Sequence, residues 1–218
     1  MRRCPLCGAG SVVLYHSDRR RDYYQCATCV LVFVPPEQQL STADEKAEYD
    51  KHQNSPHDTG YRRFLARLFI PLTAKLAANA HGLDFGSGPG PSLSVMFEEQ
   101  GYPMTIYDPF YAPDQAALTQ AYDFITATEV VEHLAQPGHV LAQLAALLTP
   151  GGYLGLMTKR VTSAEAFARW HYIADPTHVS FFSEATFRWW AAQQHFKVEF
   201  PEADVVILHK PLTTVAGS

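Results

Sequence analysis

The sequence predicts an α/β protein with a doubly wound, mostly parallel sheet, preceded by a small β unit. Two observations carry this prediction. Strand and helix signals alternate from about residue 82 onward, as they do in βαβ units. All four cysteines lie within the first 29 residues, in a segment whose charge differs from that of the remaining chain. We therefore expect three parts, at residues 1–36, 37–79 and 80–218.

Composition and charge exclude several classes of protein. The chain has 218 residues, of which 47% are hydrophobic, so it can bury a sizeable core and is not disordered. No apolar run approaches the ~18 residues of a membrane span, and no apolar stretch marks a secretory signal near the N-terminus. We expect a soluble, cytoplasmic protein without a membrane partner. The net charge is +3 in residues 1–36 but −5 overall, whereas nucleic-acid binders are usually basic.

The cysteines form two C-x2-C pairs, Cys4 with Cys7 and Cys26 with Cys29, separated by 18 residues. Each pair can aim two sulfurs at one point, and two pairs complete a tetrahedron, as in structural zinc sites. All four positions would be filled by protein, which leaves none for catalysis. Disulfides, a redox pair, or iron in place of zinc are the alternatives.

Three short strands are expected around these cysteines, at residues 12–15, 23–25 and 30–34. A unit of this size buries too little apolar surface to fold alone. Bound metal is therefore expected to supply its folding free energy, on the order of 10 kcal/mol. The segment 1–36 resembles rubredoxin-like zinc ribbons.

The connector at 37–79 begins with polar, turn-rich sequence. Ser41 or Thr42, with Glu45 downstream, can cap a short helix. Apolar side chains then recur at helical spacing over residues 61–80, and Pro71 is expected to kink or split that helix.

The most informative string is LDFGSGPG at residues 83–90. A short apolar strand carries Asp84 near its end, glycines follow at every second position, and Pro91 opens a helix. Such a turn lets a ligand approach the backbone and meet the positive end of the helix. The dinucleotide fingerprint G-x-G-x-x-G does not fit, because its third glycine would fall on Pro91.

The pattern acid-x-G-x-G-x-G resembles the first motif of class I S-adenosylmethionine-dependent methyltransferases, which have a Rossmann-like fold. The resemblance implies that Asp84 lies near the amino-acid moiety of the cofactor, above Gly86, Ser87, Gly88 and Gly90. The alternative is a glycine turn in an unrelated α/β protein.

A second strand, at residues 103–107, is followed by Asp108 and Pro109. An acid at this place can accept hydrogen bonds from both ribose hydroxyls, and the resemblance gives this role to Asp108; a surface turn is the alternative. Only 13 residues lead to the next strand, so the family's third strand is expected to be truncated or lost. Leu118 is a guess for the adenine contact.

Residues 122–134 resemble the fourth strand of these enzymes and the segment that follows it. Strand ends face the ligand crevice in such sheets, so Thr128 and Glu129 are expected at the cofactor and His133 near the substrate. An amphipathic helix follows over 140–148, and the turn TPGG at 149–152 precedes a strand at 153–157. The chain is then expected to form a helix at 184–195, capped by Ser183, and an antiparallel hairpin of residues 197–200 and 205–209.

Methyl transfer chiefly requires orientation of the reactants. A general base is needed when the acceptor is an alcohol, a phenol or an acidic carbon, and histidine has a suitable pKa. His133 and His178 are the candidates, with Asp175 as a group that could orient His178. The string DPTHVSFF at 175–182 is similar to a segment that lies beside the substrate pocket of many small-molecule methyltransferases. The alternative is that both histidines are structural.

The connector is also a candidate lid over the site. Tyr49, His52 and Tyr61 precede the first strand of the larger domain, and resembled enzymes often use this region to cover the methyl group. Tyr61 is expected at the cofactor. An ordinary solvated connector is the alternative.

The resemblance implies an S-adenosylmethionine-dependent methyltransferase that releases S-adenosylhomocysteine and acts on a small-molecule acceptor. In this reading residues 1–36 are a zinc ribbon, 37–79 a connector and lid, and 80–218 the cofactor-binding domain. One alternative is an RNA or protein methyltransferase that docks its substrate through the basic ribbon. Another is a non-catalytic binding module on the same fold.

Overall fold

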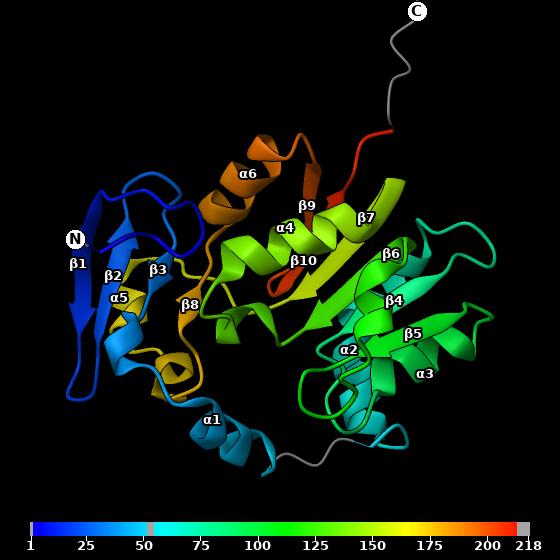
Figure 1. The fold of residues 1–218 in the computed structure, drawn as a ribbon, viewed down its shortest axis with the longest axis horizontal. Coiled ribbons are helices and arrows are strands. Elements are labelled where there is room, and N and C mark those ends of the chain that lie inside the picture. Colours follow the sequence, from blue (N-terminus) through cyan, green and yellow to red (C-terminus); the bar gives the residue numbers. More distant parts are fainter. Residues whose placement is uncertain (1, 52–54, 213–218) are drawn as a thin grey trace, which may run out of the picture.

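A six-stranded sheet forms the centre of the larger part of the molecule, in a computed structural model that describes residues 2–51 and 55–212 (Figure 1). Its strand order is β5-β4-β6-β7-β10-β9. The strands are β4 (Gly82–Phe85), β5 (Met104–Tyr107), β6 (Tyr122–Thr128), β7 (Leu148–Met157), β9 (Lys197–Glu202) and β10 (Val205–His209). The first four in the order are parallel, and the β9–β10 hairpin adds two antiparallel strands. The predicted fold class is confirmed.

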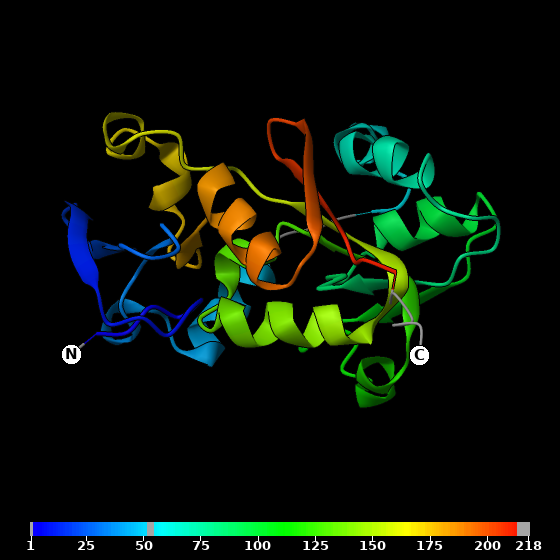
Figure 2. The ribbon, with the colours of Figure 1, turned by 90° about the horizontal axis from the view of Figure 1, so that it is seen from above.

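Helices cover both faces of this sheet, which explains why β6 is buried along most of its length. On one side lie α2 (Thr59–Thr73) and α3 (Ser92–Glu98), and on the other lies α4 (Pro137–Leu147) (Figure 2). The helix α6 (Glu184–Gln193) packs into the same core as α4. Apolar side chains of β6 alternate between the two cores, since Phe124 packs with α2 and α3 while Ile125 packs with α4.

The predicted connector helices form with different bounds. Ser41 caps α1 (Thr42–Tyr49) by accepting a hydrogen bond from the amide of Asp44. The second helix begins at Thr59, where Asp58 is the cap, and ends at Thr73 instead of residue 80. Pro71 lies inside this helix and has no N–H to donate to the carbonyl one turn earlier, and the helix ends two residues after it.

The ribbon forms a second sheet of order β1-β2-β3-β8. Its strands are β1 (Val12–Ser17), β2 (Asp22–Cys26), β3 (Val32–Phe33) and β8 (Ser180–Phe181). The first three were predicted, although β3 is shorter than expected, and Val30 at the start of the predicted range adopts a left-handed backbone with φ 62°. The fourth was not predicted: Val32 pairs with Phe181 and Phe33 with Ser180, so a strand from the C-terminal half completes this sheet (Figure 1).

Two loop regions position the site. Residues 109–121 contain a 3-10 turn at Gln115–Thr119 and add no strand to the sheet, as predicted from the short spacing. The turn at 149–152 lies within β7, which begins at Leu148, so the strand starts five residues earlier than the predicted residue 153. No helix within residues 2–51 and 55–212 is long and apolar enough to cross a lipid bilayer.

Candidate functional site

A cavity of about 720 Å³ opens at the carboxyl ends of β4, β5 and β6. Parallel strands end at the same edge of a sheet, so the loops that follow them converge there. Every residue predicted from the sequence for cofactor binding or catalysis lines this cavity: Tyr61, Asp84, Gly86, Ser87, Gly88, Gly90, Asp108, Pro109, Thr128, Glu129, His133 and His178. Their individual roles stay predictions.

The glycine turn needs glycine for two reasons at Gly86. Its φ is 74°, a left-handed conformation, and a Cβ there would lie 2.5 Å from Cγ2 of Val130. Its amide donates a 2.7 Å hydrogen bond to the carbonyl of Tyr107, which ties the turn to the end of β5. The turn therefore keeps its backbone close to the wall of the cavity, where a ligand can approach it.

Asp84 is a buried carboxylate on β4, with 3% of its surface exposed. Thr126 on β6 donates a 2.8 Å hydrogen bond to its Oδ1. Burial raises the pKa of Asp84 to about 7, and the hydrogen bond from Thr126 only partly offsets this. A buried carboxylate in this state is stabilised by a cationic ligand group.

Asp108 links the two loops that follow β4 and β5. Its Oδ2 accepts a 2.9 Å bond from the amide of Gly88, and its Oδ1 accepts bonds of 2.8 and 3.1 Å from the amides of Phe110 and Tyr111. A carboxylate offers about four acceptor sites, so acceptor capacity remains on the face toward the cavity.

Glu129 occupies a strained position directly after β6. Its φ is 53°, which is costly for a residue with a side chain, and its amide is held by the carbonyl of Met157 at 2.9 Å. Its Oε1 is buried and has no hydrogen-bond partner within the described part of the chain. Burial, and then the nearby charges of Glu132 and Asp204, raise the pKa of Glu129 to about 8.

The two candidate histidines lie against each other, with 4.7 Å between ring centroids. Nδ1 of His178 lies 2.8 Å from the carbonyl oxygen of Tyr172, and Nδ1 of His133 lies 3.3 Å from that of Thr177. A carbonyl can only accept, so Nδ1 carries the proton in both neutral rings and Nε2 carries the lone pair. Burial, and then the charge of His133, lower the pKa of His178.

Asp175 does not orient His178 in the way that the sequence suggested. In the side chains, Oδ2 of Asp175 lies 3.8 Å from Nε2 of His178, which is too long for a hydrogen bond. Oδ1 of Asp175 instead accepts bonds from the amide and hydroxyl of Thr177, at 2.9 and 2.6 Å. The carbonyl of Tyr172 is the group that orients His178.

Sequence reasoning missed Glu132 and Tyr172. Glu132 is fully buried and accepts a 2.5 Å hydrogen bond from the hydroxyl of Tyr172, whose ring centroid lies 4.0 Å from that of His178. Burial raises the pKa of Glu132. Ligand atoms of Glu132, His133 and His178 lie within 4.8 Å of one another, so this trio could hold a cation. The adjacent Glu-His pair at 132–133 was the signal in the sequence.

The candidate lid contributes two aromatic rings to the cavity. Tyr49 of α1 packs edge-on against His133, with 5.3 Å between ring centroids, and its hydroxyl donates a 2.6 Å bond to Glu45. Tyr61 of α2 also lines the cavity, where burial raises its pKa to about 12. His52, the third predicted member, lies outside the described residues.

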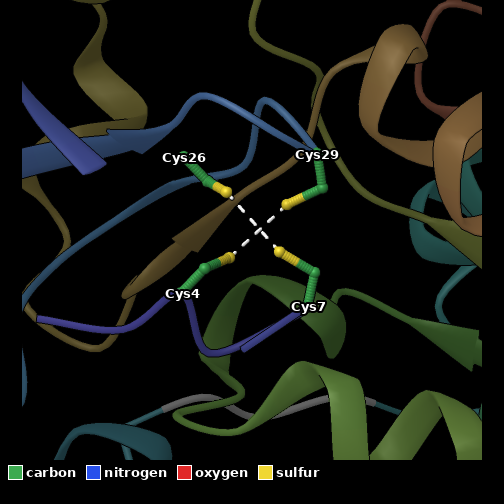
Figure 3. A group of neighbouring side chains, drawn as sticks. All are labelled: Cys4, Cys7, Cys26 and Cys29. Carbon is green, nitrogen blue, oxygen red and sulfur yellow. Dashed lines mark hydrogen bonds between the residues drawn. The ribbon is translucent and has the colours of Figure 1, made fainter. Parts of the chain in front are cut away.

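A second candidate site is the cysteine cluster, whose four sulfurs point toward a common centre (Figure 3). The sulfurs of Cys4 and Cys29 lie 3.4 Å apart, and those of Cys7 and Cys26 lie 3.5 Å apart. In a tetrahedral site with Zn–S bonds of about 2.3 Å, sulfurs lie roughly 3.8 Å apart. The donor set and its geometry therefore fit a soft divalent ion.

The family of the chain follows from comparison with known proteins. A family model described as a methyltransferase domain matches residues 53–199, which is more than half of the chain. The chain belongs to this family. Curated relatives of the methyltransferase include the ubiquinone biosynthesis O-methyltransferases of Proteus mirabilis (31% identical over 85 residues) and Vibrio vulnificus (33% over 85 residues). Each match covers 39% of this chain and about a third of the relative, 35% and 36% respectively.

Solved structures support the fold of the methyltransferase. The 1,6-didemethyltoxoflavin-N1-methyltransferase of Burkholderia thailandensis, solved with 1,6-didemethyltoxoflavin and S-adenosylhomocysteine, is 19% identical with a TM-score of 0.54. That likeness covers 90% of this chain and 98% of the other. A SAM-dependent methyltransferase from Methanosarcina mazei is 15% identical with a TM-score of 0.52, over 65% of this chain and 97% of the other. At these identities the likeness concerns the fold.

Proposed function

We propose that this methyltransferase transfers a methyl group from S-adenosylmethionine to a small-molecule acceptor and releases S-adenosylhomocysteine. The observation that carries the proposal is the composition of one cavity. A glycine turn with two strand-end acids lies at one part of it, and a pair of oriented imidazoles lies at another. The first part suits a cationic nucleoside, and the second suits an acceptor that must lose a proton.

The residues around the glycine turn would hold the cofactor. Gly86, Ser87, Gly88 and Gly90 border the cavity beside the start of α3, and Asp84 supplies a buried negative charge for the cofactor's cationic amino-acid end. The remaining acceptor capacity of Asp108 is available for ribose hydroxyls. The other proposed contacts with the cofactor are Tyr61, Pro109, Thr128 and Glu129, which line the same cavity.

When bound, S-adenosylmethionine supplies an electrophilic methyl group on a sulfonium centre. The chain then has to orient the acceptor, exclude water and accept a proton. His178 is the proposed base, because Nδ1 is committed to the carbonyl of Tyr172 and its lowered pKa keeps the ring neutral near pH 7. The rings of Tyr49 and Phe110 lie 5.8 Å apart and border the cavity beside His133, where they can exclude water.

A small acceptor suits this cavity better than a nucleic acid. The five arginines that make the ribbon basic are not all available to a polyanion, since Arg21 is buried with 7% of its surface exposed. Arg2 forms an ion pair with Glu37. The chain as a whole carries −5, which disfavours phosphate binding. The curated relatives are named for ubiquinone biosynthesis, a small-molecule pathway by that name.

For the ribbon we propose a structural zinc ion held by Cys4, Cys7, Cys26 and Cys29. Four thiolates fill a tetrahedral zinc site, so its contribution is to folding and not to the reaction. Zinc is favoured over a disulfide reading by the convergence of all four sulfurs on one centre, in place of two separate pairs (Figure 3).

Two measurements test the proposal. Isothermal titration with S-adenosylmethionine and S-adenosylhomocysteine should show one site per chain, and absence of binding at millimolar ligand would refute it. Incubation of the protein with methyl-labelled cofactor and a cell extract should then place label in the small-molecule fraction. Label in the RNA or protein fraction would contradict the acceptor class. Binding without formation of S-adenosylhomocysteine in any extract would instead indicate a non-catalytic module.

A further inference from the structure

The tip of the ribbon's first hairpin forms hydrogen bonds to the loop that carries His178. Arg21 lies at this tip, and its guanidinium donates to four backbone carbonyls of that loop. Nη1 lies 3.0 Å from the carbonyl of Pro176 and 2.9 Å from that of His178. Nη2 lies 2.8 Å from the carbonyl of Ile173 and 2.9 Å from that of Asp175. One side chain therefore fixes four points along six residues.

The burial of Arg21 makes this contact costly to lose. A buried guanidinium must satisfy its donors, and removing it would leave buried carbonyls without partners. The planar fork reaches two carbonyls on each terminal nitrogen, which an ammonium group cannot reproduce. The interaction is therefore specific to arginine.

The hairpin tip is itself held rigid by Asp18. Its Oδ1 accepts bonds of 2.7 and 2.8 Å from the amides of Arg20 and Arg21, and its Oδ2 accepts a 2.9 Å bond from the hydroxyl of Tyr23. That hydroxyl also lies 3.3 Å from the carbonyl of Ile173, on the loop that Arg21 grips. The tip presents a preformed surface to the loop.

Backbone pairing continues from the loop into the site. The amide of Val34, after β3, donates a 2.9 Å bond to the carbonyl of Val179, and the amide of Val179 donates a 2.8 Å bond to the carbonyl of Glu132. Residue 179 therefore joins the ribbon to the Glu132–His133 segment, directly after His178. The ribbon and the acceptor side of the cavity form one hydrogen-bonded unit.

We propose that the ribbon is a built-in part of the acceptor half of the active site, and that Arg21 is the positioning residue that sets the loop 172–178 and the ring of His178. This inference rests on the proposed function for its catalytic meaning. It assigns the ribbon a role in placing the general base, in contrast to a docking module for a separate substrate. The cofactor half of the cavity, around β4 and β5, has no part in these contacts with Arg21.

The test compares Arg21→Met, which keeps the apolar stem and removes the donors, with Arg21→Lys and with the exposed neighbour variant Arg19→Met. The first readout is the ring tautomer of His178 in ¹⁵N-labelled full-length protein, assigned by comparison with His178→Asn. The wild type and Arg19→Met should show a proton on Nδ1. Arg21→Met should show a mixture of tautomers, because the loop no longer holds Nδ1 against Tyr172, and Arg21→Lys should fall between them.

The second readout separates the two halves of the site. Arg21→Met should keep its affinity for S-adenosylhomocysteine within about threefold while label transfer to the small-molecule fraction falls at least tenfold. An unchanged tautomer with unchanged transfer would overturn the proposal, and so would an equal loss of S-adenosylhomocysteine binding, which marks a fold-wide defect. If the proposed function itself were wrong, the wild type would not bind the cofactor. The tautomer of His178 could still be measured in that case, because this readout needs no turnover.

Discussion

The carbonyl oxygen of Tyr172 lies 2.8 Å from Nδ1 of His178, deep in the wall of the cavity. Because the carbonyl has no proton to give, this contact fixes which nitrogen of the ring is protonated. The Nε2 lone pair is then the basic site of the neutral ring. Burial lowers the pKa of His178, so the neutral form persists to more acidic pH than for an exposed histidine.

Replacing His178 with asparagine should remove the base while keeping the contact with Tyr172, because the asparagine amide can donate in place of Nδ1. We expect methyl transfer to fall by about 10²–10⁴-fold, the usual contribution of a general base, with affinity for S-adenosylhomocysteine changed less than about threefold. Transfer rates and titration calorimetry measure the two effects. The control is His139→Asn at an exposed position of α4, which should leave both unchanged.

The pH dependence of transfer should follow the same histidine. Its pKa is lowered, so the active neutral ring dominates above the ordinary histidine value of about 6.5. We expect a rate that is flat at higher pH and falls only on acidification below that value, measured at saturating cofactor. A rate that falls as pH rises from 6 to 7.5 would contradict a neutral His178 acting as base.

Asp84 should make the cofactor-free protein less stable at neutral than at acidic pH. Its folded-state pKa of about 7 exceeds the ordinary 3.8, so the folded state binds more protons between these values and loses stability as pH rises through them. Asp84→Asn should raise the free energy of unfolding by up to about 4 kcal/mol, because the variant no longer buries an ionised carboxylate. In a protein of this size, each kcal/mol of stability raises the melting temperature by roughly 2–4 °C. The melting temperature of the variant should therefore exceed that of the wild type at pH 8.

The same substitution, Asp84→Asn, should weaken cofactor binding. With no buried negative charge for the cationic end of the cofactor, Asp84→Asn should bind S-adenosylmethionine at least tenfold more weakly. The stability gap should close below about pH 4, where the wild-type carboxyl is protonated in both states. A variant that is destabilised at pH 8, or that binds cofactor as well as the wild type, would show that Asp84 is a structural group.

Much of the fold was predictable because its signals are local. The alternation of apolar strands and amphipathic helices, the glycine turn at 86–90 and the Ser183 cap each depend on residues close together in the chain. The cavity residues could be found for the same reason: parallel strands place their carboxyl ends at one edge, so motifs that follow strands meet there.

What could not be predicted depends on distant pairs. β8 has two residues and no periodicity, so its pairing with β3 leaves no mark in the sequence. Arg21 appeared in the sequence as one of several charges in a basic segment. In the structure it donates hydrogen bonds to carbonyls of residues more than 150 positions away in the sequence. Every residue type has a backbone carbonyl, so the sequence does not show which carbonyls will accept a hydrogen bond from a side chain. The adjacent Glu-His pair marked residue 132 in the sequence, but its burial could not be predicted, because its partner Tyr172 is 40 residues away.

Gly86 offers a test of the turn that separates backbone strain from crowding. Gly86→Ala should suffer both, since φ is 74° and its Cβ would overlap Val130, whereas Gly101→Ala has φ 85° and nothing within 4 Å of its Cβ. We expect Gly101→Ala to lower the free energy of unfolding by about 1–2 kcal/mol through backbone strain. Gly86→Ala should lower it by about an additional 1–3 kcal/mol through overpacking. Adding Val130→Ala to Gly86→Ala should recover part of that difference. Equal costs for both glycines, measured by chemical denaturation, would contradict the predicted overlap.

The cysteine cluster should hold one zinc ion per chain, and its loss should weaken the whole protein. Cys7→Ser removes a ligand, whereas Cys7→His supplies another zinc ligand at the same half-buried position. We expect elemental analysis to show near-stoichiometric zinc in the wild type and Cys7→His, and strongly reduced zinc in Cys7→Ser. Metal loss should lower the melting temperature by roughly 10 °C, equivalent to several kcal/mol of stability. The ribbon should not unfold fully, because its pairing with β8 and the hydrogen bonds of Arg21 remain. Iron in place of zinc, or two disulfides found by mass spectrometry of the untreated protein, would refute the zinc assignment.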